Sequence, residues 1–329
     1  MKLPRRQFLH LAAGAAVLAA VTHTAGAQPY PNRPITVIVP FPAGGGADAI
    51  GRIVTERMRA SLGQPIIMEN VTGANGSIGA GRAARAAADG YTLVVGLWNT
   101  HVANGVIYPL PYDVTRDFEP VALLASNPFL IIARKAMPAD DLSGLIAWLR
   151  ANPDQATMGT PGAGSPGHVS GVLFQHTTGT RFQFVPYRGA SALMPDLVAG
   201  QIDIVFGDPT TGLPLARAGT IKSFAVMSGS RFTAAPDIPT VDEAGLPGFY
   251  MSNWYALFAP KGTPKDLVAK LNAAVIEALA DPKVRARLAD QGQEIPPRER
   301  QTPEALADLQ KAEIKKWWPI IKAAGIKVE

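Results

Sequence analysis

The chain contains no cysteine among its 329 residues. This excludes disulfides, zinc sites built from thiolates and thiol catalysis. The five histidines form no H-E-x-x-H pattern, so the sequence predicts no metal site. Charged residues are scarce, at 17% of the chain, and the formal charge of +5 is not concentrated in any Lys/Arg run. We therefore expect no metal, no cofactor and no nucleic-acid partner.

The first 27 residues have the pattern of an export signal. Lys2, Arg5 and Arg6 precede an apolar, alanine-rich segment at 9–21 that is short for a membrane span. Ala-Gly-Ala at 25–27 fits a cleavage site, so we expect a mature periplasmic protein that starts near residue 28. Two consecutive arginines also resemble a twin-arginine signal, and a general secretory signal is the alternative.

The stretch V-I-V-P-F-P-A-G-G-G-A-D at 37–48 predicts an anion site. A short β-branched strand at 35–39 is followed by glycines 44–46, and Asp48 is a candidate N-cap for a helix over 49–62. Unpaired backbone N–H groups and the helix dipole at such a junction attract a carboxylate. The glycines are not followed by G-K-[ST] and miss the G-x-G-x-x-G spacing, so no nucleotide is expected. A tight turn without a ligand is the alternative.

Strands alternate with helices along the chain, which predicts an α/β fold with mostly parallel sheets. Apolar residues 128–133 are expected to cross into a second domain, and a strand at 254–259 is expected to return to the first. Residues 108–120 are rich in proline and aspartate and predict a connector. From residue 264 onward, amphipathic helices are expected to pack on the first domain. A cleft between two such domains is a usual site for a small ligand.

An exported hydrolase is the first alternative. A-G-S-P-G at 163–167 loosely resembles the G-x-S-x-G nucleophile elbow. The first glycine is missing, and Pro166 lacks the N–H that an oxyanion hole would need. No acidic residue lies between Ser165 and His176, the last histidine of the chain, so the order Ser, acid, His is missing. We therefore expect no catalytic residues.

Several motifs in order resemble one known family. They are P-F-P-A-G-G-G-A-D at 40–48, N-V-T-G-A-N-G-S-I-G at 70–79, V-P-Y-R-G-A at 185–190, L-V-A-G-Q-I-D-I-V-F at 197–206 and D-I-P-T-V-D-E-A-G-L-P-G at 237–248. The chain resembles the Bug-type (TctC-like) extracytoplasmic solute receptors, which are the binding subunits of tripartite tricarboxylate transporters. The resemblance covers essentially the whole mature chain.

This resemblance implies a two-lobed type II periplasmic-binding-protein fold with a ligand cleft between the lobes. One lobe would comprise residues 28–127 and 242–329, and the other residues 128–241. It implies a solute-binding protein, not an enzyme, that captures a dicarboxylate or aromatic carboxylate for membrane permease subunits, as a monomer. An exported sensory receptor for a carboxylate is the second alternative. The chain departs from the family at Leu97-Trp98-Asn99 and Gly105.

The residues and the resemblance together give a set of candidate ligand-binding residues. It consists of Phe41, Gly44, Gly45, Gly46, Asp48, Asn75, Gly76, Ser77, Thr100, Gly164, Ser165, His168, Tyr187, Arg188, Gly189, Ala190 and Asp208.

Three of these candidates have specific expected roles. Asp48 is expected to act more as a helix cap than as a ligand contact, because its charge repels an anion. Arg188 would pair with a second carboxylate, with a surface position or an interlobe ion pair as the alternative. Asp208 would bind an amine or hydroxyl of the ligand, or cap the segment that follows it.

Overall fold

The structure, a computed structural model, describes residues 30–327. The expected export signal at 1–27 lies outside the described residues. All elements below belong to one compact unit that begins at Arg33. Within the described range, no helix has both the length and the apolar composition to cross a bilayer.

The first sheet is built from both ends of this unit. Its spatial order is β2 (Ile66–Asn70), β1 (Ile35–Val39), β3 (Thr92–Leu97), β10 (Ser252–Pro260) and β4 (Phe118–Pro128). Strands β2, β1 and β3 are parallel, whereas β10 runs antiparallel to both β3 and β4. The returning strand β10 therefore lies between two segments that precede it in the sequence by more than a hundred residues.

The second sheet comes from the middle of the chain. Its spatial order is β7 (Gln183–Pro186), β6 (Thr157–Thr160), β8 (Ile204–Gly207), β5 (Leu130–Arg134) and β9 (Ile221–Val226). Strands β7, β6 and β8 are parallel, and β5 is antiparallel to β8 and β9. Both sheets are mixed rather than mostly parallel, because the strands next to the two crossings, β4, β5, β9 and β10, pair antiparallel.

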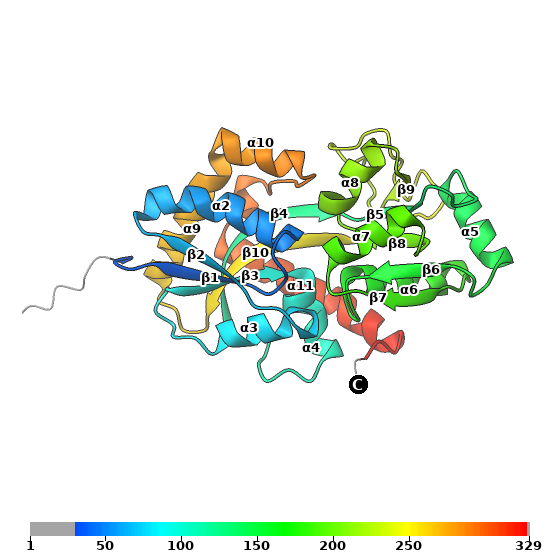
Figure 1. The fold of residues 1–329 in the computed structure, drawn as a ribbon. Coiled ribbons are helices and arrows are strands. Elements are labelled where there is room, and N and C mark those ends of the chain that lie inside the picture. Colours follow the sequence, from blue (N-terminus) through cyan, green and yellow to red (C-terminus); the bar gives the residue numbers. More distant parts are fainter. Residues whose placement is uncertain (1–29, 328–329) are drawn as a thin grey trace, which may run out of the picture. The chain divides into compact units, whose positions relative to one another are not determined.

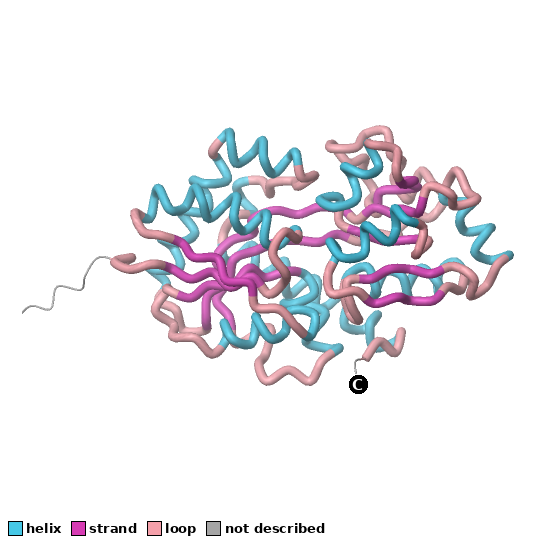
Figure 2. The backbone as a smooth tube through the Cα atoms, in the orientation of Figure 1, coloured by secondary structure: helices cyan, strands magenta, loops and turns pink. Residues whose placement is uncertain are grey.

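Helices flank both sheets (Figures 1 and 2). Those with the first sheet are α2 (Gly46–Leu62), α3 (Ser77–Ala84), α4 (Asn104–Ile107), α9 (Lys265–Ala280), α10 (Pro282–Asp290) and α11 (Pro303–Ala323). Those with the second are α5 (Leu142–Ala151), α6 (Pro166–Thr178), α7 (Ala190–Ala199) and α8 (Pro209–Arg217). Short helical turns are η1 (Ala74–Gly76), the π-helical η2 (Asn99–Ala103) and η3 (Arg298–Arg300). In Figure 1, α2 and α10 lie on one side of the first sheet, and α3 and α4 lie on the other.

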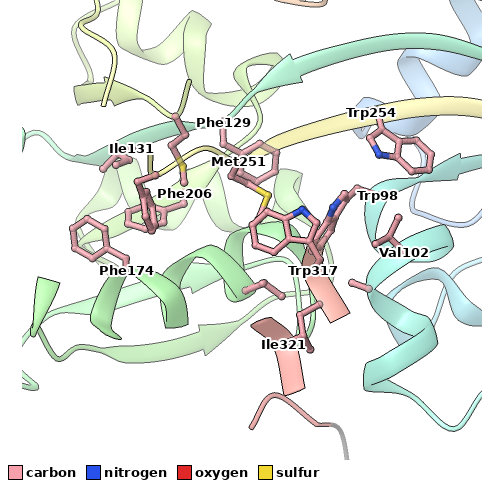
Figure 3. Packing of buried hydrophobic residues seen from close by; sticks show 14 of the residues in the cluster. Trp98, Val102, Phe129, Ile131, Phe174, Phe206, Met251, Trp254, Trp317 and Ile321 are labelled. Atoms are coloured by element: carbon pink, nitrogen blue, oxygen red, sulfur yellow. The ribbon is translucent and has the colours of Figure 1, made fainter. Parts of the chain in front are cut away.

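The apolar run of β5 is explained by burial on both faces of its sheet. Ile131 and Ala133 belong to one buried cluster, and Leu130 and Ile132 to another. The alternation follows the two-residue period of a strand, so a strand covered on both faces reads as a continuous apolar run. The first of these clusters also contains Trp317 of α11 and residues of the first sheet, so it joins the two sheets (Figure 3).

Two expectations from the sequence are corrected here. The expected connector at 108–120 overlaps β4, an eleven-residue strand that begins at Phe118. The expected N-cap of the first helix was Asp48, but α2 begins at Gly46 and its N-cap is Gly45. Asp48 lies in the first turn, and its carboxylate accepts a hydrogen bond from the Gly44 N–H at 3.0 Å. It reaches back to the residue before the N-cap, so it supports the glycine turn and does not form a capping box.

Candidate ligand-binding site

A pocket of about 100 Å³ lies between the strand ends of the two sheets, and we call it the central pocket. Its wall combines residues that precede or begin helices with residues from strand ends. The lining residues are Phe41, Pro42, Gly45, Gly46, Ala47, Asn75, Leu97, Asn99, Phe129, Pro161, Ser165, Pro166, Gly167, Gly189, Ala190, Leu193, Met194, Val205, Phe206, Gly207, Asp208, Thr210, Thr211, Asn253 and Tyr255. Apolar side chains predominate in this wall, which suits the body of a small organic ligand.

Four helices begin at the central pocket. The N-cap residues of α2, α6, α7 and α8 are Gly45, Ser165, Gly189 and Asp208, and all four line it. Each helix N-terminus carries backbone N–H groups without intrahelical partners and a partial positive charge. Backbone groups therefore bring partial positive charge to the pocket wall, although none of its described lining residues is Lys, Arg or His.

Two of the four helix N-termini are capped by the side chain of their N-cap residue. The other two have no side-chain cap, and we call them open. The Ser165 hydroxyl accepts from the His168 N–H at 3.2 Å, and Asp208 Oδ1 accepts from the Thr210 N–H at 2.8 Å. Gly45 and Gly189 offer no side-chain cap to α2 and α7. One open end belongs to each sheet, so a single carboxylate between them would contact both halves of the fold.

Asp208 also joins the two sheets through Tyr255 of β10. The Tyr255 hydroxyl donates to Asp208 Oδ2. Burial, followed by the negative charge of Asp208, raises the pKa of Tyr255 well above its ordinary value. A Cβ at Gly46 would lie 2.7 Å from this hydroxyl, so the close approach of α2 to Tyr255 requires glycine at that position.

Asn75 is held in a left-handed backbone conformation at the pocket wall. Its φ is 50°, which is uncommon for a residue other than glycine. Its carbonyl oxygen accepts from Asn99 Nδ2 at 3.1 Å and from Asn104 Nδ2 at 3.0 Å. Its side-chain amide donates to Asn104 Oδ1 at 3.1 Å and accepts from Asn99 Nδ2 at 2.9 Å. We call Asn75, Asn99 and Asn104 the asparagine clamp, because they fix η1 against η2.

A second hollow of about 480 Å³, which we call the outer hollow, adjoins the central pocket. Phe41, Pro42, Asn75, Pro161 and Gly189 line both cavities.

Tyr187 and Arg188 line only the outer hollow. The Tyr187 hydroxyl donates to Asp196 at 2.6 Å, and this bond to a carboxylate raises the pKa of Tyr187 to about 12. The Arg188 side chain is exposed at the rim.

The central pocket brings together roughly half of the predicted site residues. Those that line it are Phe41, Gly45, Gly46, Asn75, Ser165, Gly189, Ala190 and Asp208. Gly76, Tyr187 and Arg188 line the outer hollow. Gly44, Asp48, Ser77, Thr100, Gly164 and His168 line neither cavity.

Asp48 is one of these six, and its carboxylate supports the turn from behind. It is 4% exposed and accepts from Gly44 N–H, Arg52 Nε and Asn70 Nδ2. Burial raises the pKa of Asp48, but the hydrogen bonds from Arg52, Gly44 and Asn70 outweigh it, so its pKa is lowered. The Gly44 N–H is thereby engaged within the protein.

Two further predicted residues are also engaged within the protein. Thr100 is fully buried, and its hydroxyl accepts from the Leu97 N–H at 2.9 Å. His168 Nδ1 accepts from the Gly164 N–H at 3.2 Å, which ties the loop before α6 to its first turn.

Sequence reasoning missed Tyr255, Asn253, Phe129 and Asn99 as lining residues. Tyr255 and Asn253 lie at the start of an antiparallel strand. The rule that ligands collect where parallel strands end therefore gave no signal for them. Asn99 follows the end of the parallel strand β3, so the same rule could have found it. In the described residues, no group of three or more His, Asp or Glu side chains could hold a metal ion.

Comparisons with known proteins identify relatives over nearly the whole chain. The chain is 34% identical over 314 residues to the protein BugT of Bordetella pertussis, covering 94% of this chain and 95% of BugT. It is similar to the structure of MatC from Rhodopseudomonas palustris with bound malate. The TM-score is 0.85 and the identity 41%, over 89% of this chain and all of that one. An R. palustris protein solved with adipate has a TM-score of 0.85 and 32% identity, over 91% of this chain and all of that one.

The fold is accordingly the two-lobed α/β fold of periplasmic binding proteins. A family model described as "Tripartite tricarboxylate transporter family receptor" matches residues 50–326. The chain therefore belongs to the receptor family of tripartite tricarboxylate transporters, and it is a solute-binding protein and not an enzyme.

Proposed function

We propose that this chain captures a small organic acid in the central pocket and presents it to the permease subunits of a tripartite tricarboxylate transporter. The observation that carries the proposal is the pair of open helix N-termini at Gly45 and Gly189, one from each sheet. A carboxylate that bridges them would stabilise the closed arrangement of the two lobes. The structures of relatives with malate and adipate support an acid as the ligand.

The proposal includes the lobes and the ligand contacts. Residues 28–127 with 242–329 form one lobe and residues 128–241 form the other, a division supported by the strand membership of the two sheets. Of the predicted contacts, the eight that line the central pocket would touch the acid directly. Arg188, at the outer hollow, would attract anions to the opening.

The proposal also covers the setting of the receptor. It acts as a monomer in the periplasm after cleavage near Ala27, which is supported by the signal-like sequence and by a relative described as the periplasmic binding protein BugD.

A thermal-shift comparison of acids with their uncharged amides tests the ligand class. Any molecule that binds only the native state raises the melting temperature by mass action. At a ligand concentration of 100 Kd the free energy of unfolding increases by about 2.7 kcal/mol. We expect carboxylates such as benzoate and succinate to raise the melting temperature, and benzamide and succinamide to leave it unchanged. Equal shifts for an acid and its amide would contradict an anion site. The acid should be recovered chemically unchanged.

A matched pair of variants tests the helix N-terminus itself. Ala190→Asp and Ala192→Asp both place an acid in the first turn of α7, where it interacts favourably with the dipole. Only residue 190 lines the central pocket, whereas residue 192 is exposed. We expect Ala190→Asp to weaken acid binding about tenfold or more by charge repulsion, and Ala192→Asp to change it little. Calorimetry that gave equal affinities for the two variants would overturn this placement.

A further inference from the structure

Two segments cross between the sheets side by side and form the hinge of the fold. The first joins β4 to β5 at Pro128 and Phe129, and the second leads into β10 at Met251 and Ser252. The Phe129 N–H donates to the Met251 carbonyl at 2.9 Å, so the two crossings are bonded to each other. A rotation of one sheet relative to the other must therefore bend both crossings at the same level.

The two faces of this hinge border different cavities. Phe129 and Asn253 line the central pocket. Their sequence neighbours Pro128 and Ser252 line a hollow of about 190 Å³, which we call the hinge hollow. Ser252 pairs with Pro128, and side chains alternate between the faces of a strand, so the hinge hollow lies on the opposite face of the crossings from the central pocket. A rotation that widens the central pocket consequently narrows the hinge hollow.

The hinge hollow has one wall from each half of the fold. Helix α11 contributes Lys316 and Trp317, and Lys316 Nζ lies 4.8 Å from the centre of the Trp317 ring. The opposite wall consists of the residues that follow β9 and of Tyr250. The Met251 N–H donates to the Met227 carbonyl at 3.1 Å, which holds the segment with Tyr250 against the second sheet.

On the other side of the hinge, the two halves are in contact across the central pocket. The Tyr108 hydroxyl, after α4, donates to the Ala163 carbonyl before α6 at 2.9 Å. Gln293 Nε2, after α10, donates to the Thr210 hydroxyl of α8 at 2.7 Å. The structure therefore shows the closed arrangement, in which the hinge hollow is widest.

Tyr250 is a large side chain that this arrangement leaves exposed. Its exposed fraction is 42%, which places it among the few large apolar side chains at the surface of the described residues. Across the hollow, α11 presents the Lys316 stem and the Trp317 ring. When the hollow narrows, Tyr250 would pack against this wall and bury apolar surface that the closed arrangement leaves in water. The open arrangement thus has a contact of its own.

We propose that Tyr250 is a positioning residue for ligand capture: its contact across the hinge hollow stabilises the open arrangement and thereby sets how tightly the receptor binds an acid. The inference rests on the proposed function, because it takes closure of the lobes around the acid as part of binding. The apparent dissociation constant is the intrinsic one divided by the closed fraction. Removing the open-state contact therefore tightens binding without any change in the central pocket.

Calorimetry with succinate and benzoate on Tyr250→Ala tests this role. We expect the affinity to rise about threefold or more, because only the open arrangement loses a contact. Tyr250→Phe keeps the ring and loses the hydrogen bond from the hydroxyl to Asp242, so it should bind as the wild type does. An unchanged or weaker affinity in Tyr250→Ala would overturn the inference, because a residue that only supports the fold would not tighten binding when truncated.

A larger side chain at Ser252 tests the hinge hollow from the other crossing. Ser252 is exposed where it lines the hollow, so Ser252→Leu would fill space in the closed arrangement and obstruct the narrowing that opening requires. We expect its affinity to rise about threefold or more as well. Ser61→Leu, at an exposed serine of α2 outside the hollow, is the control and should leave the affinity unchanged. Equal affinities in Ser252→Leu and Ser61→Leu would contradict the proposal.

Small-angle X-ray scattering measures the open–closed equilibrium directly. Without acid, Tyr250→Ala and Ser252→Leu should have a smaller radius of gyration than the wild type. With saturating acid, all three should be alike, because the ligand then holds each of them closed.

Failure of the inference is distinguishable from failure of the proposed function. If either acid bound the wild type and both variants with one affinity, the hinge role would be refuted and the carboxylate receptor would stand. If neither acid bound, the receptor proposal would be refuted for these two acids, and scattering without acid would decide the hinge role. Equal radii of gyration in the wild type and both variants would then refute it.

Discussion

His101 is a fully buried histidine beside the asparagine clamp. Its ring stacks on Phe258 at 4.0 Å between centroids, and its Nδ1 atom lies 2.9 Å from the Thr100 hydroxyl. Burial lowers the pKa of His101 from 6.5 to about 3, while its Nε2 atom has no hydrogen-bond partner in the described protein. The folded protein therefore holds this imidazole neutral over a pH range in which the unfolded chain protonates it.

This burial predicts a pH dependence of stability. Because the folded pKa is depressed, the contribution of His101 is fully present above about pH 6.5 and is lost as the pH falls toward about 3. As the pH falls through that window, the free energy of unfolding should decrease in both proteins. The decrease should be steeper in the wild type than in His101→Asn by about 1.4 kcal/mol per pH unit. Urea unfolding at pH 4 to 7 measures both slopes. His176→Asn, at an exposed position on α6, should keep the wild-type slope, and a wild-type slope in His101→Asn would contradict the prediction.

Residue identity alone could assign some roles and not others. Glycines 45 and 46 stood out in the sequence, and both line the pocket. Asp48 and Thr100 stood out equally, yet their polar atoms are engaged within the protein. Whether a polar side chain faces a cavity or its own backbone depends on the turn geometry, which spacing along the chain does not determine.

At the scale of elements, the asparagine clamp sets the position of η1. Asn104→Ala would remove the donor to the Asn75 carbonyl, the donor to Ser77 Oγ at 2.9 Å and the acceptor for the Asn75 amide. We expect the free energy of unfolding to fall by about 1–3 kcal/mol. We expect acid binding to weaken about fivefold, because the left-handed turn at Asn75 would no longer be held in place.

Urea unfolding and calorimetry on Asn104→Ala measure these two effects. Asn152→Ala is the matched control, since it removes the hydrogen bond that Asn152 Nδ2 donates to the Trp148 carbonyl at the end of α5, outside the pocket wall. It should leave acid affinity unchanged. If Asn104→Ala were destabilised but bound acids with full affinity, the clamp would hold the fold and not the site.

Elements with a strong local pattern could be predicted, whereas those fixed by packing could not. Apolar runs in the sequence predicted β1, β5 and β10, and the amphipathic segments after residue 264 predicted α9 to α11. The sequence of β4 begins after a stretch rich in Pro and Asp, and it is a strand because it pairs with β10 along nine residues. Helix α8 contains Pro214 and Gly212, which are poor helix formers, and its Asp208 cap and buried Leu213 compensate.

At the scale of the whole molecule, α11 and one carboxylate hold the shared core together. Glu313 Oε2 accepts from the indole N–H of Trp98 at 2.9 Å and of Trp317 at 3.0 Å. Both rings are buried in the cluster that contains residues of both sheets, and they meet edge to face at 5.3 Å (Figure 3). Each sheet therefore buries part of its apolar surface against the other, so separating the two sheets would expose these residues to water.

We predict a single unfolding transition that Glu313→Ala shifts as a whole. The variant leaves two buried indole donors without an acceptor, which should lower the free energy of unfolding by about 2–4 kcal/mol. Glu313→Gln keeps an acceptor oxygen and should lose less. Far-UV circular dichroism and tryptophan fluorescence in urea should report coincident curves. Two separate transitions in the wild type would show that the lobes unfold independently.

The order of strands in the first sheet has a consequence for the timing of synthesis. Strand β3 ends at Leu97, but its antiparallel neighbour β10 is not complete until Pro260 has been made. At about 5–20 residues per second, roughly 8–30 s separate the two events on a ribosome. During that interval the buried edge of β3 has no partner strand. We therefore expect the emerging chain to keep an apolar strand edge unpaired while the entire second sheet is translated, which exposes it to aggregation until β10 has been made.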